Sequence, residues 1–252
     1  MIIFLILAAA AILGGAANAL AGGGTFMTFP ALLLAKVAPV KANATASLVL
    51  LPGAFASAWV YRDIVRQVSG KFLLSMLGAS LAGSLAGSML LLHTSNATFS
   101  SLVPWLLLIA TAVFSLAPWI RKMAVGSAGH QSFAALLSGQ LIISAYGGYF
   151  GAGMGVLMIA LYLLASNLDV HAASGLRLIC SCAINLLAVI LFAWRGAIVY
   201  TAGIPMLVAG VIGGYVGALA MKKMDANVAR RAILIYAWAL TAFFFGRMLL
   251  GR

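Results

Sequence analysis

Long apolar runs alternate with short polar stretches along the whole chain, and this pattern predicts a helical membrane protein. A helix that spans a bilayer needs about 20 predominantly apolar residues, and most of the runs reach that length. The fold class that follows is an all-α integral membrane protein. The predicted segments are residues 2–20 with 25–35, 42–60, 72–92, 99–119, 132–149 with 153–166, 172–193, 198–220 and 227–249.

The first and the fifth of these segments are too long for one crossing, and glycines interrupt each of them near its middle. Glycine-rich breaks release backbone N–H and C=O groups that lipid cannot satisfy, so they are tolerated where they line a cavity. Paired breaks in the two halves of a membrane protein indicate the binding site of a transporter. The glycines concerned are Gly22, Gly23 and Gly24 in the first segment and Gly151, Gly153 and Gly155 in the fifth.

The two broken segments align with each other at an offset of 131 residues, and so do other parts of the chain. Residues 22–27 align with 153–158 and Gly83 aligns with Gly214. We therefore predict a single membrane domain made by tandem duplication. Its parts are repeat one (1–119), a linker (120–131) and repeat two (132–252). Spaced small residues in segments 72–92 and 198–220 predict that these helices pack closely against neighbours.

The number of crossings depends on how the broken segments fold. Single passes give eight membrane segments, whereas hairpins give ten and invert the second repeat, so we predict 8 to 10. The hairpin version puts nine Lys and Arg residues on one side and five on the other. Because cytoplasmic loops carry an excess of Lys and Arg, this imbalance favours inverted repeats with the N-terminus outside.

Composition excludes a soluble protein. The chain has 252 residues, of which 65% are hydrophobic and 7% charged, whereas a soluble domain carries about 25% charged residues. The net charge is +12, but the cations lie between apolar runs, so we expect a lipid bilayer and no nucleic acid as partner. Ala17-Asn18-Ala19 resembles a signal-peptidase site, but no basic residue precedes the apolar run, so we expect a retained segment.

Arg177 is the one charge clearly inside a predicted segment. Placing Arg there costs about 2.5–3.5 kcal/mol on insertion scales, so its side chain should face protein or water. By three- and four-residue spacing, Ser174, Arg177, Ser181 and Asn185 share one helical face. Guanidinium, hydroxyl and amide donors suit an oxyanion. The alternative is that Arg177 extends to the interface or binds helix-end carbonyls.

The matching helix start in repeat one carries Asn43, Thr45 and Ser47, which are further candidates for the site. Their alternative role is N-capping or hydrogen bonding back to the preceding turn. Thr25, next to the first break, offers a hydroxyl. Helices that begin after the breaks would add N–H donors and a positive dipole end.

Acidic residues are scarce, because the chain has three Asp and no Glu. A cation pump built on membrane carboxylates therefore lacks its ligands. The sequence also lacks the HExxH and GxSxG motifs of hydrolases. Cys180 and Cys182 are two apart on a helix and diverge. We expect no enzyme activity, no cofactor and no metal site.

The stretches Gly22–Pro30, Ala42–Ser47 and Gly147–Gly155 together resemble the sulfite exporter TauE/SafE family, also called the sulfonate uptake permease family. The resemblance covers essentially the whole chain. It implies a multi-pass secondary transporter of the bacterial inner membrane for sulfur-containing anions. The family's glycine motifs fall on Gly22, Gly23, Gly24 and Pro30, and on Gly151, Gly153 and Gly155. The second copy lacks a counterpart of Pro30.

Residues and resemblance together predict a secondary transporter that moves small sulfur-containing oxyanions, sulfite or an organosulfonate, by alternating access. The alternatives are a passive anion channel and a carrier for another small organic anion. A membrane scaffold would need larger loops. The partner is a small anionic substrate, and a homodimer is left open.

Overall fold

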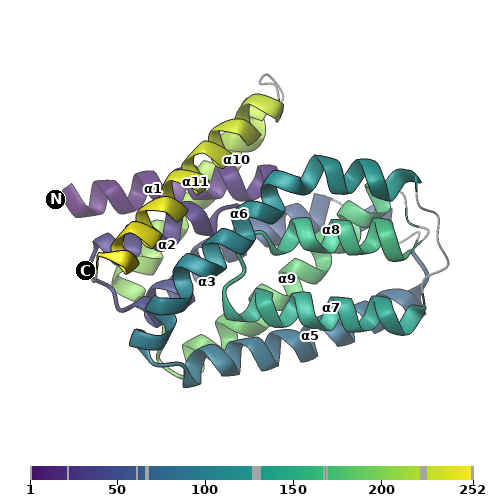
Figure 1. Cartoon of the computed structure of the whole chain (residues 1–252), viewed down its shortest axis with the longest axis horizontal. Coiled ribbons are helices and arrows are strands. Elements are labelled where there is room, and N and C mark those ends of the chain that lie inside the picture. The colour runs from purple at the N-terminus through teal and green to yellow at the C-terminus, as the bar shows by residue number, and fades with distance from the viewer. Residues whose placement is uncertain are drawn as a thin grey trace.

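The computed structural model describes the backbone of residues 2–21, 23–60, 62–65, 68–126, 132–166, 168, 170–221 and 226–250, and the regular elements within these ranges are all α-helices (Figure 1). The predicted fold class is confirmed. The helices are α1 (Ile2–Ala21), α2 (Thr25–Leu34), α3 (Pro39–Val60), α4 (Arg62–Val65), α5 (Gly70–His93), α6 (Asn96–Gly126), α7 (Phe133–Tyr149), α8 (Met154–Ala165), α9 (Val170–Trp194), α10 (Tyr200–Met221) and α11 (Ala226–Leu249).

The helix boundaries follow the apolar runs closely, with one correction. Helix α6 continues to Gly126 instead of ending at 119, so the first half of the predicted linker is helical. The reason is local: residues 120–125 contain no glycine or proline, and Gly126 is the first weak helix former after Pro118. Residues 127–131 lie outside the described part of the chain.

The described helices differ in whether they could cross a membrane. By length and composition, Gly70–His93, Asn96–Leu116 and Ala172–Trp194 are long and apolar enough. Shorter apolar stretches cover Ile2–Asn18, Thr25–Leu34, Met154–Ala165, Tyr200–Tyr215 and Ile233–Leu249.

Helices α7 and α8 form an antiparallel hairpin. The Tyr162 hydroxyl of α8 donates to Oε1 of Gln140 on α7 at 2.8 Å. Nearer the turn, Gly147 of α7 faces the side chain of Met154 at the start of α8. Residue numbers therefore fall along one helix as they rise along the other, which excludes a single continuous crossing for this segment.

Helices α1 and α2 form the corresponding hairpin in the first half of the chain. Gly14 of α1 faces Thr28 of α2, and Gly24, at the turn, faces Asn18. In Figure 1, α1 enters from the end of the molecule where both termini lie, while α7 and α8 lie side by side toward the opposite end. Both broken segments therefore fold as antiparallel helix pairs.

Each hairpin packs against a helix from the other half of the chain. Helix α7 packs along α5, where Gly87 faces the carbonyl of Ala145. Helix α1 packs along α10, where Gly213 faces the carbonyl of Ile12. A side chain at either glycine would collide with backbone, so the predicted role of these small residues in close packing is confirmed. Helices α3 and α9 pack against each other between the two pairs.

Candidate functional site

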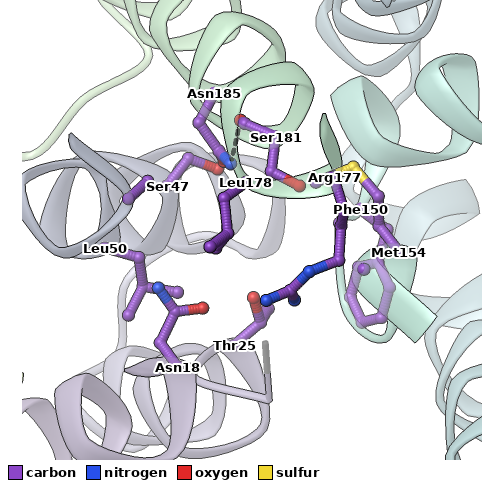
Figure 2. A pocket seen from close by; sticks show the side chains of 13 residues that line it. Asn18, Thr25, Ser47, Leu50, Phe150, Met154, Arg177, Leu178, Ser181 and Asn185 are labelled. Carbon is purple, nitrogen blue, oxygen red and sulfur yellow. Dashed lines mark hydrogen bonds between the residues drawn. The ribbon is translucent and has the colours of Figure 1, made fainter. Parts of the chain in front are cut away.

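A cavity of about 50 Å³ lies where the two helix breaks meet α3 and α9 (Figure 2). It draws on both hairpins, because Asn18 and Thr25 come from the first and Phe150–Gly155 from the second. By the same measure a water needs about 10–15 Å³, so the cavity has room for a small ion or a few waters. The lining residues are Asn18, Thr25, Ser47, Leu50, Ala54, Phe150, Gly151, Met154, Gly155, Arg177, Leu178, Ser181 and Asn185.

Arg177 brings the charge to this cavity. Its side chain lies across the first turn of α8, at Gly155. A Cβ atom added to Gly155 would lie 2.5 Å from Nη1 and 3.2 Å from Cδ of Arg177. Glycine at this position therefore makes room for the guanidinium, which joins two of the predicted site residues in one contact. The guanidinium offers a fixed positive charge and several N–H donors to a ligand.

Polar groups of the first hairpin lie near this charge. Figure 2 shows the hydroxyl of Thr25 and the amide of Asn18 on the side toward which the Arg177 guanidinium extends. Thr25 is the first residue of α2, just as Met154 and Gly155 begin α8. The N-terminal turns of two half-helices thus border the cavity, and helix N-termini carry a partial positive charge that favours anions.

On the opposite side of the cavity in Figure 2, α9 and α3 contribute neutral polar groups. Asn185 donates through Nδ2 to the carbonyl of Ser181 at 2.8 Å. Ser47 of α3 donates to the carbonyl of Asn43 at 3.2 Å. Both side chains are anchored to their own helices, so their remaining hydrogen-bonding capacity is held in a fixed direction.

The break of the second hairpin has the backbone that its glycines permit. Gly151 and Gly153 have φ values of +79° and +74°, which L side chains rarely adopt. Phe150 lies between the end of α7 and Gly151. It is buried, and its ring packs edge to face against the ring of Phe29 at a centroid distance of 5.7 Å. The Tyr146 hydroxyl donates to the carbonyl of Ala152 at 2.7 Å. The turn is therefore rigidly packed on one side and open to the cavity on the other.

Some predicted site residues do not line the cavity. Thr45 donates to the carbonyl of Lys41 at 2.7 Å and accepts from the Val199 amide at 3.0 Å, so it joins α3 to the start of α10. Asn43 donates to the carbonyl of Tyr149, at the end of α7, at 2.9 Å. The alternative role of hydrogen bonding within the helix thus holds for Thr45 and for Ser47, although Ser47 also reaches the cavity.

The remaining predicted positions that the structure describes do not line the cavity. Gly24 packs against Gly14, Asn18 and Leu50, and Gly153 packs against Ala110 of α6. Gly23 faces Ile233 and Phe26. Ser174, one turn before Arg177, is not among the lining residues. Gly22 lies outside the described residues.

Sequence reasoning missed six lining residues, but a signal for three of them was present. Ser47, Leu50 and Ala54 on α3 lie 131 residues before Leu178, Ser181 and Asn185 on α9, which is the offset between the two halves. Applying that offset to Ser181 and Asn185 of α9 predicts Leu50 and Ala54, and applying it to Ser47 of α3 predicts Leu178. Asn18, Phe150 and Met154 carry no comparable signal.

Comparison with known proteins places the chain. The family model described as sulfite exporter TauE/SafE matches residues 7–244. The chain belongs to the TauE/SafE family. This match confirms the resemblance that the glycine-rich stretches indicated, and it covers nearly the whole chain.

Relatives from three bacteria agree with this placement. The chain is 27% identical over 232 residues to a probable membrane transporter protein of Haemophilus influenzae, covering 89% of this chain and 88% of that protein. It is 24% identical over 235 residues to the probable membrane transporter protein YfcA of Escherichia coli K12, covering 92% and 86%. A probable membrane transporter protein of a Sinorhizobium species is 26% identical over 237 residues, covering 92% and 88%. This TauE/SafE family member is a membrane transporter.

Proposed function

We propose that the chain is a multi-pass secondary transporter of the bacterial inner membrane that moves a small sulfur-containing oxyanion, sulfite or an organosulfonate, by alternating access. The observation that carries this proposal is the position of Arg177 in a cavity bordered by the first turns of α2 and α8. The family description names sulfite, and the charge at the cavity has the sign that such a substrate requires.

The electrostatics of the cavity favour an anion. None of its 13 lining residues is Asp or Glu, and Arg177 is the one charged side chain among them. A guanidinium and two helix N-termini act together where little water competes, which strengthens their attraction for an oxyanion. Asn18 and Thr25 add neutral polar groups that fix the orientation of the ligand.

Alternating access follows from the way the hairpins meet. They enter from opposite ends of the molecule (Figure 1), and their turns reach the same cavity. The packing is reciprocal, because α1 lies along α10 and α7 lies along α5. That exchange supports the proposed duplication with inverted halves. In such transporters, one repeat rocks against the other around a fixed site.

Counterflow in proteoliposomes tests the proposal. Vesicles loaded with unlabelled sulfite should accumulate labelled sulfite transiently in the presence of the wild-type chain. Arg177→Ala should lower the affinity for sulfite by more than tenfold, because the cavity loses its charge. Arg195→Ala is the matched control. It removes the same charge from the exposed end of α9, where Arg195 lies over the Trp194 ring, and should change affinity by less than about twofold.

Three results would contradict the proposal. Unchanged affinity in Arg177→Ala would remove this residue from the site. Sulfite flux without counterflow would favour the passive anion channel. Counterflow of small carboxylates but not of sulfite or sulfonates would favour the carrier for another organic anion.

A further inference from the structure

Helices α3 and α9 present equivalent positions to the cavity. Ser47, Leu50 and Ala54 of α3 precede Leu178, Ser181 and Asn185 of α9 by one constant offset of 131 residues. The three positions on each helix share one face by three- and four-residue spacing. The cavity is therefore built from the same two helical faces, one from each half of the chain.

The chemistry of the two faces is nevertheless different. At the same offset, the counterpart of Arg177 is Ala46, which is buried. Ser181 and Asn185 likewise correspond to Leu50 and Ala54, each only 8% exposed. Helix α9 thus carries the guanidinium, hydroxyl and amide, whereas α3 offers an apolar wall with Ser47 at one edge.

We propose that Leu50 and Ala54 determine which anions the cavity accepts, by contacting the uncharged part of the bound anion. This inference rests on the proposed function. An anion whose oxygens meet Arg177, Thr25 and the helix N-termini has to direct its remaining part elsewhere. Leu50 and Leu178 extend into the same space in Figure 2, so that part meets hydrocarbon.

The wall is held firmly enough to discriminate. Leu50 packs against Gly24 at the first break. A Cβ atom added to Gly24 would lie only 2.6 Å from Cδ2 of Leu50. This contact with the turn before α2 limits the room for Leu50 to move in that direction. A hydrophobic pocket discriminates one methylene by about 10–200-fold when the surrounding packing is rigid. Ala54, with its single methyl group, leaves the remaining space open.

A series of anions with one constant head group tests this role. Methanesulfonate, ethanesulfonate and propanesulfonate compete with labelled sulfite in the counterflow assay, and the ratio of their inhibition constants reports on the wall. Leu50→Ala enlarges the cavity and should strengthen the inhibition by propanesulfonate relative to methanesulfonate by at least about tenfold. Ala54→Val narrows it and should move the same ratio in the opposite direction. The two variants make opposite changes in volume, so either one that folds decides the question.

The control is Leu51→Ala, the same truncation at the next position of α3, which does not line the cavity. Its ratio should equal that of the wild type. A ratio that stays at the wild-type value in each of the two variants that folds would overturn the inference, while sulfite counterflow would leave the proposed function intact. Absence of counterflow for every anion in the wild type would instead overturn the proposed function, and this inference with it.

Discussion

The outer helix pairs and the central helix pair use the two halves of the chain in opposite ways. In α1–α10 and α5–α7 both halves make the same kind of contact, with a glycine against the backbone of the neighbouring helix, although Gly87 and Gly213 are not at equivalent positions. In α3 and α9 the cavity-facing positions also match, but one half supplies Arg177 and the other Ala46. The difference shows that a close contact between helix backbones requires a small residue, whereas the residue type at a cavity-facing position depends on the ligand.

The strongest way to break this comparison is to place a side chain in an outer pair. Gly87→Val puts a branched side chain against the Ala145 carbonyl, which cannot move without separating α5 from α7. We expect loss of the monodisperse folded protein, or a fall in melting temperature of more than about 10 °C, because overpacking commonly costs about 1–3 kcal/mol even against side chains that can adjust. Size-exclusion chromatography and thermal unfolding in detergent measure this.

Gly78→Val is the matched control in the same helix. A Cβ atom on Gly78 meets nothing within 4 Å, so valine there should leave the elution profile and the melting temperature nearly unchanged. Equal damage from the two substitutions would mean that helix propensity, and not the contact with α7, makes glycine necessary in α5.

A buried polar network tests whether the outer pairs serve packing alone. Gln140 of α7 donates to Ser80 of α5 at 2.7 Å, and the Tyr162 hydroxyl donates to Gln140 at 2.8 Å. Gln140→Leu removes both bonds, although the Ser80 hydroxyl keeps its bond to the Met76 carbonyl at 2.7 Å. It should lower the free energy of unfolding by about 1–3 kcal/mol. Affinity for sulfite should stay within about twofold, since Gln140 does not line the cavity.

Tyr162→Phe sharpens that experiment, because it removes the bond between α8 and Gln140 but keeps the bond from Gln140 to Ser80 of α5. It should lower stability less than Gln140→Leu does. If Gln140→Leu weakened anion affinity by more than tenfold without lowering the melting temperature, the network would belong to the site, and the contrast between outer and central helices would fail.

The smallest effect is expected at Asn43, where α3 meets the turn of the second hairpin. Its Nδ2 donates to the Tyr149 carbonyl, but its buried Oδ1 has no hydrogen-bond partner within the described part of the chain. Asn43→Ala removes a buried unpaired acceptor but also leaves the Tyr149 carbonyl without its Nδ2 donor. The two effects partly cancel, so the net loss should be about 1 kcal/mol. Thermal unfolding measures it, and a loss above about 3 kcal/mol would mean that Oδ1 is satisfied.

Local signals were sufficient to predict the helices and the two breaks. Glycine clusters predicted where α1 and α7 turn back, and the cost of an embedded charge pointed to Arg177. Such features are visible in sequence because they depend on a residue's own chemistry and on near neighbours. The spaced small residues also predicted that α5 and α10 would pack closely, although the tight contact in α10 is at Gly213 and not at Gly214, which the offset pairs with Gly83.

Contacts between distant segments gave no such signal. The bond from Asn43 to Tyr149 joins residues 106 positions apart, and neither residue type indicates the other. Asn18 was interpreted as part of a motif resembling a signal-peptidase site, yet it lies in the cavity wall. Thr45 has the hydroxyl that a binding site uses, but the amide of Val199 takes it. In each case a partner brought close by folding decides the role.

The shortness of α2 and α8 has a consequence for biogenesis. They contain 10 and 12 residues, which at 1.5 Å per residue is about 15 and 18 Å, well short of the roughly 30 Å hydrocarbon core. Neither is long enough to be inserted as an independent span, so each has to enter the membrane together with the helix that precedes it. Since the cavity lining extends from Asn18 to Asn185, the ribosome completes most of the chain before the site can assemble.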